Sequence, residues 1–337
     1  MSRTRPTVGI TMGDPAGIGP EIIANAYDAA SDVARPVVLG DARVMETAVD
    51  LVGADLELKA IPAVEEAAFE EGVLDVVDFG NVGDLTFGAI TGEYGRASIE
   101  YVEHVIDCAL DGRVDAIANG PINKEAMSLA GSDYAGHTNL LADRTGTERY
   151  AMFNVADEFV VSQVTAHVPL VEACELVTTE RVLETVRVTE VGMESLGVTD
   201  PTIAVAGLNP HAGEGGVLGT EDSEEIEPAV ERAREEGTDA HGPLPSDSLY
   251  NQAIAGHYDA VVAMYHDQGH IPLFVQEYVE GGGVGGAGMT AGLPFVRTTT
   301  VHGTGHDIAG ENVATPASMI DAIRVAARGG RHHPPSA

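Results

Sequence analysis

Three histidines follow three apolar, β-branched stretches of the sequence. His167 comes after FVVSQVTA, His211 after TIAVAGLNP and His266 after DAVVAMY, so each imidazole is expected one to four residues beyond the end of a strand. If these strands are parallel, the three side chains emerge at the sheet edge where open α/β folds bind ligands. Three imidazoles with a fourth position open are the donor set of a catalytic zinc or similar divalent ion. We therefore predict a metal site, with three unrelated loop histidines as the alternative.

Two further segments carry side chains that could do chemistry. His137 and Thr138 follow a glycine in DYAGHTNLL and are expected to open a helix, where an imidazole and a hydroxyl can bind an anion or a substrate oxygen. The alternative for this pair is a plain helix N-cap. Asp247, in PSDS, either moves a proton or orients a ligand, or it caps a short helix that follows Pro243 and Pro245.

Lysine is rare in this chain, which makes Lys124 in NGPINKEAM a candidate catalytic residue. The sequence holds 18 Lys and Arg against 53 Asp and Glu, a net charge of −35, and its lysines are Lys59 and Lys124. Such a surface repels nucleic acid and anionic membranes and is unsuited to an acidic partner. Adaptation to high salt, which screens self-repulsion, is the simplest account. The alternative for Lys124 is an ordinary surface lysine.

Length and composition favour a cytoplasmic protein of two α/β lobes. A chain of 337 residues suits two packed α/β lobes rather than one core. No apolar run approaches the roughly 18 residues that a membrane span needs, and the N-terminal stretch is expected to be a strand rather than a signal peptide. The two cysteines, Cys108 and Cys174, form no disulfide framework and fit a reducing compartment.

The elements that would position these side chains alternate between strands and helices. Apolar repeats at i, i+3, i+4 and i+7 predict helices over 94–111 and 315–328. Alternation of this kind favours a mainly parallel α/β sheet. The expected strands cover residues 7–12, 37–40, 74–79, 115–120, 159–165, 202–207, 259–264 and 295–301.

Two glycine-rich segments are expected to be loops, for different reasons. The stretch 280–292 is expected to be a loop, and its literal GxGxxG at 283–288 is discounted because no strand precedes it and no helix follows it. The segment Gly13–Glu21 connects the first strand to the first helix, and its glycines let the backbone approach a ligand. The tail over 331–337 is expected to be frayed.

Long motifs make the chain similar to a known family. GITMGDPAGIGPEI, NGPINKEAM, YAGHTNLL, HVPL, GLNPHAGEGG, GPLPSDSLY, MYHDQGHIP and GLPFVRTT resemble the 4-hydroxythreonine-4-phosphate dehydrogenase (PdxA) family of vitamin B6 synthesis, which includes threonate and erythronate 4-phosphate dehydrogenases. The resemblance implies an isocitrate/isopropylmalate dehydrogenase-like fold of two α/β/α lobes, with the active site in the interdomain cleft. On this basis we divide the chain into 1–130 plus 300–330 and 131–299.

The resemblance also implies a function. It predicts a homodimer that oxidises a secondary alcohol of a small, 4-phosphorylated hydroxy acid with NAD or NADP and a divalent ion (Zn, Mn, Mg or Co), followed by decarboxylation. His167, His211 and His266 would bind the metal near the dimer interface, where one ligand can come from the partner subunit. His137 and Thr138 of AGHT and Arg297 of LPFVRT would contact the substrate.

Three positions depart from the family pattern. Phe274 stands where the family has a substrate-binding lysine, Gly288 where it has an asparagine, and Val301 where it has an acidic residue. Loss of one charged hydrogen bond costs about 1.5–3 kcal/mol, enough to change substrate preference. We therefore keep three alternatives open: the same site acting on a less charged hydroxy acid or diol, a metal-dependent hydrolase or lyase without nicotinamide, and a non-catalytic binding protein.

Overall fold

The chain forms two compact α/β units. A computed structural model describes residues 5–134, 136–156, 159–279 and 286–332. Unit 1 consists of Met1–Glu148 and Leu293–Ala337, and unit 2 of Arg149–Gly292. In the part of the chain that the structure describes, no helix is long and apolar enough to cross a membrane. Most of the tail expected to be frayed, residues 333–337, lies outside the described residues.

Unit 1 is built on a parallel sheet. Its strands are β1 (Thr7–Thr11), β2 (Arg35–Gly40), β3 (Glu57–Ile61), β4 (Val73–Asp78), β5 (Ala116–Asn119) and β12 (Val296–Thr300). Their order is β3-β4-β2-β1-β5-β12, and every pair is parallel. The central strand β1 is buried along its whole length, as expected of an apolar strand that is covered on both faces.

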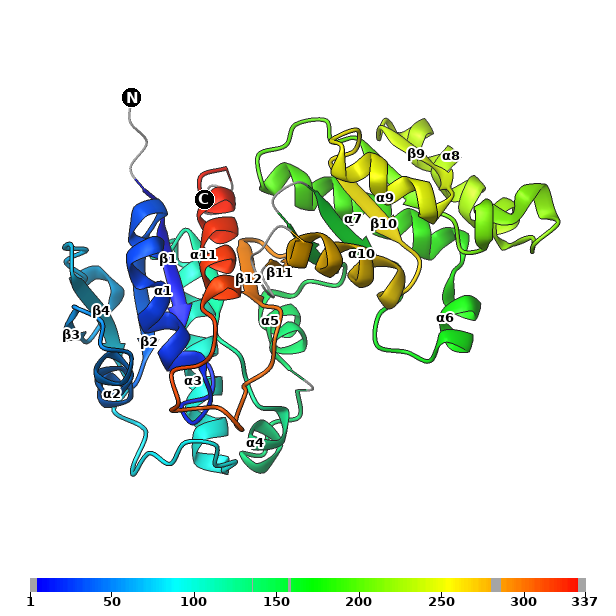
Figure 1. Cartoon of the computed structure of the whole chain (residues 1–337). Helices are drawn as coiled ribbons and strands as arrows, with labels where there is room; N and C mark the ends of the chain where they lie inside the picture. The colour runs from blue at the N-terminus through cyan, green and yellow to red at the C-terminus, as the bar shows by residue number, and fades with distance from the viewer. Residues whose placement is uncertain (1–4, 135, 157–158, 280–285, 333–337) are drawn as a thin grey trace. The chain divides into compact units, whose positions relative to one another are not determined.

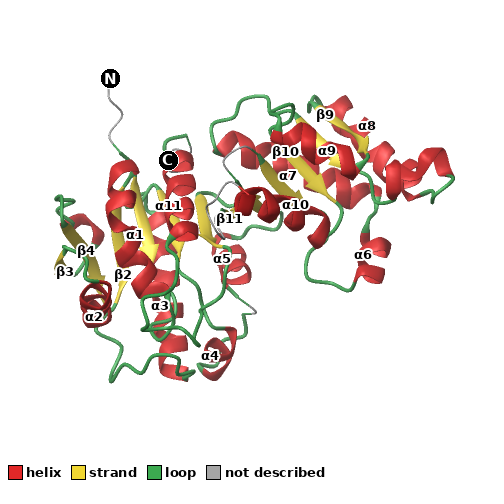
Figure 2. Ribbon diagram, in the orientation of Figure 1, coloured by secondary structure: helices red, strands yellow, loops and turns green. Residues whose placement is uncertain are grey.

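Helices cover both faces of the unit 1 sheet. They are α1 (Gly19–Val33), α2 (Ala42–Val52), α3 (Gly92–Leu110), α4 (Lys124–Leu129), α5 (His137–Thr145), α11 (Ala317–Gly330) and the short 3₁₀ helix η1 (Val64–Glu66). Both α3 and α11 contact β1, and Figures 1 and 2 show α11 in front of the strands and α3 behind them. Thr91 caps α3 by accepting a hydrogen bond from the Tyr94 backbone N–H at 3.3 Å.

Unit 2 has a mixed sheet of similar size. Its strands are β6 (Ala151–Val155), β7 (Val160–Gln163), β8 (Ile203–Ala206), β9 (Ala240–Leu244), β10 (Ala260–Ala263) and β11 (Ala287–Ala291). Their order is β11-β6-β7-β10-β8-β9. The pairs β7–β10, β10–β8 and β8–β9 are parallel, whereas β6 is antiparallel to both β7 and β11. The three strands expected to precede the histidines are therefore parallel neighbours.

The helices of unit 2 surround this sheet. They are α6 (Leu170–Leu176), α7 (Thr179–Ser195), α8 (Glu227–Glu236), α9 (Ser246–Ile254) and α10 (His266–Val279), with the irregular turns η2 (Pro210–Gly216) and η3 (Asp222–Ile226). The buried core includes side chains of β7, β8, β10, α9 and α10, among them Val161, Ala204, Leu249, Val261 and Leu273. Only short loops connect the parallel strands to the site side chains.

The structure confirms the strands and helices expected from the sequence and adds four strands. The expected loop over 280–292 is wrong for Ala287–Ala291, which form β11 and pair with β6; residues 280–285, and with them most of the GxGxxG, lie outside the described part. Strand β3 is mostly exposed and β9 (AHGPL) contains glycine and proline, so neither showed an apolar run. The fourth added strand is β6, which pairs antiparallel with β7 and β11.

The unit boundaries differ from the division made on the sequence. Residues 131–148 belong to unit 1, because Arg144 at the end of α5 pairs with Glu103 and Asp107 of α3, at 3.2 and 2.6 Å. Strand β12 also belongs to unit 1, because it pairs with β5. His137, Thr138, Lys124 and Arg297 therefore lie in unit 1.

Candidate active site and metal centre

The three histidines follow adjacent parallel strands of unit 2. His167 comes four residues after β7, His266 three residues after β10 and His211 five residues after β8. The rings of His167 and His266 lie side by side, with their centroids 5.3 Å apart. His211 lies beside Asp247 instead, with Nε2 3.9 Å from Oδ2. These side chains therefore form two pairs, His167 with His266 and His211 with Asp247. Among the described residues, no group of three or more His, Cys, Asp or Glu is placed to hold one metal ion.

His211 lies in a strained turn. The residues from His211 to Gly215 all have positive φ angles, 54°, 52°, 76°, 45° and 64°. Such backbone costs a non-glycine residue of order 1–2 kcal/mol, and it persists where the surrounding structure enforces it. Buried Asp222 provides one anchor, because its carboxylate accepts hydrogen bonds from the backbone N–H groups of Leu208 and Asn209 at 2.8 and 3.2 Å.

In two of the three histidines, His211 and His266, the Nδ1 atom lies within hydrogen-bond distance of a carboxylate. His211 Nδ1 lies 2.8 Å from Glu214 Oε1, a contact that the left-handed turn makes possible. His266 Nδ1 lies 2.8 Å from Asp267 Oδ1. A histidine that donates Nδ1–H to a carboxylate presents Nε2 as the lone-pair donor, which is how most metal-binding histidines are oriented. The donor chemistry of these residues therefore fits a divalent cation at Nε2.

Gln268 forms hydrogen bonds with the segments that carry His266, His211 and Asp247. Its Oε1 accepts a hydrogen bond from the Met264 backbone N–H at 2.6 Å, at the start of α10. Its Nε2 donates to the Gly207 carbonyl at 2.7 Å and to Ser246 Oγ at 2.8 Å. Gly207 leads into the turn of His211, and Ser246 precedes Asp247. Sequence reasoning did not select Glu214, Asp267 or Gln268, although all three lie inside the motifs that contain the histidines.

In unit 1, His137 and Arg297 form a buried pair. Arg297 is 2% exposed; its Nε donates to Asn119 Oδ1 at 2.6 Å, and its Nη2 lies 3.1 Å from His137 Nδ1. Burial lowers the pKa of Arg297 to about 9. Burial, with the positive charge of Arg297 as a second cause, holds the pKa of His137 well below its ordinary value. Asn119, which the sequence analysis missed, in turn donates to Thr11 Oγ1 at 2.9 Å.

His137 opens α5 as expected, but the N-cap alternative for this segment is wrong. The N-cap is Gly136, and no side chain caps the helix. Thr138 follows in the first turn. Lys124 begins α4 and is exposed, and a Cβ built on Gly136 would lie 3.7 Å from Lys124 Cε. The lysine side chain therefore lies beside the start of α5.

Asp247 lies in the first turn of α9 and does not cap it. The N-cap is Pro245, and no side-chain hydrogen bond caps the helix, so the capping alternative is wrong. The Asp247 side chain is 70% exposed and is close to His211. This exposure leaves its carboxylate free to approach a ligand.

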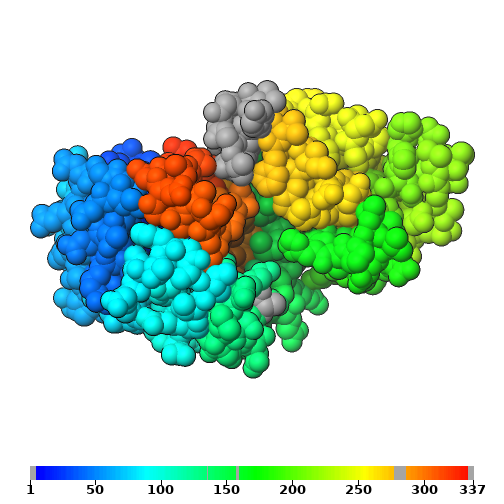
Figure 3. Space-filling model, turned by 60° about the horizontal axis from the view of Figure 1, so that its bottom comes forward, coloured from blue at the N-terminus to red at the C-terminus, as the bar shows by residue number. Residues whose placement is uncertain are grey.

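The segment after β1 contacts two other loops of unit 1. The Ile18 backbone N–H donates to the Thr304 carbonyl at 2.9 Å, and His306 Nε2 lies 3.3 Å from buried Asp14 Oδ2. A Cβ on Gly13 would lie 2.3 Å from the Pro121 carbonyl oxygen, so this glycine allows close backbone packing. Figure 3 shows the orange-red residues after β12 against the blue and cyan segments of this unit.

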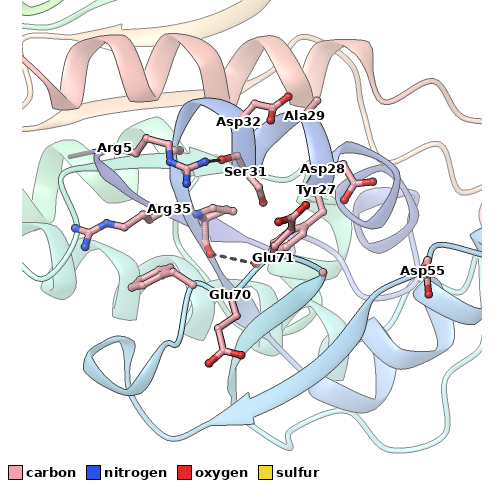
Figure 4. A pocket seen from close by; sticks show the side chains of 14 residues that line it. Arg5, Tyr27, Asp28, Ala29, Ser31, Asp32, Arg35, Asp55, Glu70 and Glu71 are labelled. Atoms are coloured by element: carbon pink, nitrogen blue, oxygen red, sulfur yellow. Dashed lines mark hydrogen bonds between the residues drawn. The ribbon is translucent and has the colours of Figure 1, made fainter. Parts of the chain in front are cut away.

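One cavity in the described part of the chain lies apart from the predicted site residues, and a smaller one lies close to them. One, of about 760 Å³, lies at the amino end of β2 in unit 1 and includes Arg5, Tyr27, Arg35 and Phe69 in its lining (Figure 4). None of the side chains predicted to form the site lines it. A smaller cavity of about 240 Å³ lies beside the turn of His211, where Ala212, Gly213 and Asp222 line it.

The positions that depart from the family pattern have structural roles. Phe274 is half-buried on α10 and packs against the hydrophobic core of unit 2. Gly288 lies in β11, opposite Asn154 of β6. The Val301 backbone N–H donates to Ser318 Oγ at 3.0 Å.

Comparisons with known proteins agree with the resemblance. The chain is 44% identical over 332 residues to a 4-hydroxythreonine-4-phosphate dehydrogenase of Desulforapulum autotrophicum, which covers 97% of this chain and 96% of that protein. It is 43% identical over 328 residues to a D-threonate 4-phosphate dehydrogenase of Cupriavidus necator, with 96% and 97% covered.

Solved structures show the same fold. A crystal structure of a 4-hydroxythreonine-4-phosphate dehydrogenase from Burkholderia phymatum matches with a TM-score of 0.87 at 39% identity, covering 97% of this chain and 99% of that chain. A terephthalate 1,2-cis-dihydrodiol dehydrogenase from Burkholderia xenovorans matches with a TM-score of 0.67 at 30% identity, covering 96% and 98%. The expected isocitrate/isopropylmalate dehydrogenase-like fold and the assignment as a dehydrogenase are thereby confirmed. The model of the pyridoxal phosphate biosynthetic protein PdxA family matches residues 32–326, and the chain belongs to this family.

Proposed function

We propose that the chain is a divalent-metal- and NAD(P)-dependent dehydrogenase that oxidises a secondary alcohol of a small, 4-phosphorylated hydroxy acid, with decarboxylation of the product. The observation that carries this proposal is the placement of His167, His266 and His211 after three neighbouring parallel strands. The relatives named above act on 4-hydroxythreonine 4-phosphate and D-threonate 4-phosphate. Zinc, manganese, magnesium and cobalt all remain candidates for the ion.

The histidines would hold the ion through Nε2, since Glu214 and Asp267 engage Nδ1 of His211 and His266. When bound, a divalent ion supplies Lewis-acid stabilisation of negative charge on a substrate oxygen. Nicotinamide is the hydride acceptor in this class of reaction. Asp247, 3.9 Å from His211 Nε2, would orient a ligand or accept a proton at Oδ2.

In unit 1, His137 would donate a hydrogen bond to a substrate oxygen. Arg297 has only donors, so Nδ1 of His137 must accept from it and Nε2 must carry the ring proton. Thr138 lies in the first turn of α5, and the side chain of Lys124 lies beside this turn; both would contact the anionic end of the substrate. Arg297 would then act on the substrate through the neighbouring His137, since its own guanidinium is buried.

A homodimer is part of this proposal. Aliphatic side chains next to His167 and His266 are exposed: Leu170 and Val171 on α6 by 60% and 76%, Ile271 and Val275 on α10 by 59% and 57%. Such side chains are commonly buried at subunit interfaces. The substitutions Val171→Asp and Ile271→Asp together should give a monomer by light scattering, whereas Val313→Asp, at a 63% exposed position in unit 1, should not.

The function can be tested with a substrate panel. Four-carbon hydroxy acids, phosphorylated and free, would be assayed for NADH or NADPH formation and carbon dioxide release with added Zn²⁺, Mn²⁺ or Mg²⁺. His211→Ala should abolish both metal retention and turnover, whereas His257→Ala, at an exposed position after α9, should change neither. Full activity of His211→Ala would exclude this ligand set.

A second candidate is a dehydrogenase of a less charged hydroxy acid or diol. Two observations favour it: Phe274 offers no cation at its position, and a terephthalate dihydrodiol dehydrogenase has the same fold at 30% identity. Faster turnover of unphosphorylated substrates in the same panel would support this candidate over the first.

A further inference from the structure

Three aromatic rings lie in a column along α10. His266, His270 and Phe274 are spaced by four residues, which places them on one face of the helix. The centroids of the His266 and His270 rings are 3.9 Å apart with an interplanar angle of 21°, so the two imidazoles are stacked. The His270 and Phe274 centroids are 5.4 Å apart. The column therefore runs from the hydrophobic core to one of the proposed metal ligands.

The middle ring of this column is held on two sides. Nδ1 of His270 lies 2.8 Å from Nε2 of Gln163 and 3.1 Å from the His266 carbonyl oxygen. Gln163 is the last residue of β7, the strand that leads to His167. Phe274 packs against the core cluster that contains Val161, Ala263 and Leu273. The His270 ring is thus held by the polar contact of its Nδ1 with Gln163 and by packing against the Phe274 ring.

A glycine allows this arrangement. A Cβ at Gly269 would lie 2.7 Å from Val161 Cγ1, 3.2 Å from Ala263 Cβ and 3.5 Å from Gln163 Nε2. Any larger residue would push α10 away from β7 and β10. The close approach of helix and strands brings His270 within hydrogen-bond reach of Gln163.

We propose that His270 is a positioning residue for the His266 imidazole. Its ring, held by Gln163 and Phe274, forms the surface on which His266 stacks, and this limits His266 to orientations that leave Nε2 free. This inference rests on the proposed function, because it needs His266 as a metal ligand. Residues that orient metal-binding histidines typically contribute about 10- to 100-fold to metal affinity.

The test is a titration of the metal-free full-length protein with Co²⁺ alone, followed by visible absorption, which also reports the geometry around the ion. His270→Ala removes the stacking surface and should weaken Co²⁺ binding about 10- to 100-fold. His270→Phe keeps an aromatic ring against His266 and should keep most of the affinity. Gln163→Leu releases the ring edge and should fall between these two variants.

Controls separate positioning from folding and from adventitious binding. His257→Ala removes an exposed histidine outside the column and should bind Co²⁺ as the unmodified chain does. Thermal unfolding of the metal-free variants shows whether His270→Ala folds. If His270→Ala does not fold, His270→Phe and Gln163→Leu test the positioning role instead. Equal loss of Co²⁺ affinity in these two variants would overturn stacking as the mechanism.

The remaining outcomes distinguish the two proposals. If His266→Ala loses Co²⁺ while His270→Ala binds it with unchanged affinity and spectrum, the positioning role is overturned and the metal site stands. If His266→Ala itself binds Co²⁺ normally, the proposed metal site fails and the positioning role fails with it.

Discussion

Nη2 of Arg297 lies 3.1 Å from Nδ1 of His137, and this contact fixes where the imidazole carries its proton. A guanidinium can only donate, so Nδ1 accepts and the neutral ring has its proton on Nε2. Nε2 is buried and has no hydrogen-bond partner among the described residues. His137 is therefore a neutral N–H donor with one unused hydrogen, and a substrate oxygen would satisfy it.

Replacing Arg297 should disrupt this donor. Arg297→Lys keeps a positive charge, but its single ammonium group cannot reproduce the planar geometry that serves both Asn119 and His137. Loss of one charged hydrogen bond costs about 1.5–3 kcal/mol, so we expect kcat/KM to fall by roughly one to two orders of magnitude. Arg324→Lys, at an exposed arginine on α11, is the matched control. Wild-type kcat/KM in Arg297→Lys would contradict the assignment.

The buried state of His137 should also appear in the pH dependence of stability. Its pKa is lowered in the folded chain, by burial first and by Arg297 second, so the unfolded chain binds a proton more readily. The contribution of neutral His137 to the free energy of unfolding is fully present above the ordinary histidine pKa of 6.5. It is lost as pH falls below that value, by at most about 1.4 kcal/mol per pH unit.

We therefore expect His137→Gln to flatten the decline of the unfolding temperature between pH 6.5 and 5, relative to the unmodified chain. His257→Gln, at an exposed position, should leave the decline unchanged. Parallel pH profiles for the chain and for His137→Gln would show that His137 is protonated in the folded state.

The sequence predicted the parallel strands well because their apolar runs reflect burial on both faces. Strand β8, Ile203–Ala206, is wholly buried and was readily found, whereas β3 is mostly exposed and was missed. Strand β11 was interpreted as loop because glycine dominates its surroundings. It forms because β6 offers an antiparallel partner, a long-range pairing that local composition does not encode.

The site was predictable at the level of strand ends but not of side-chain partners. Parallel pairing places His167, His211 and His266 at one edge of unit 2, and periodicity alone selected them. The contact of His211 with Glu214 depends on a run of residues with positive φ angles, and no sequence pattern predicted this run. Asn119 was missed because its role arises from the pairing of β5 with β12, residues far apart in the chain.

Glu214 should matter for metal binding rather than for folding. Glu214→Gln keeps the size of the side chain but removes the charge beside His211 Nδ1. We expect metal affinity to fall about 10- to 100-fold with little change in the unfolding temperature of the metal-free chain. Asp239→Asn is the matched control, because Asp239 lies 2.9 Å from His241 in the same unit, outside the site. Equal metal affinity of Glu214→Gln and the control would refute this role.

The net charge of −35 should make stability depend on salt. The Debye length falls from about 10 Å at 0.1 M to about 3 Å at 1 M, so added salt screens repulsion among the acidic side chains. We expect the unfolding temperature to rise between 0.1 and 1 M KCl. A fall in the unfolding temperature over this range would argue against adaptation to high salt.

Position 274 should decide between phosphorylated and unphosphorylated substrates. Phe274 is half-buried, and Phe274→Lys would cost about 1–3 kcal/mol of stability through lost packing. If a phosphate lies near this position, the new cation should raise kcat/KM for 4-phosphorylated substrates relative to free ones by roughly one to two orders of magnitude. Val191→Lys adds a cation at an exposed position of α7 in the same unit, outside the proposed dimer interface, and controls for general electrostatic attraction. An equal gain in both variants would place the phosphate site elsewhere, and no gain in either would favour an uncharged substrate end.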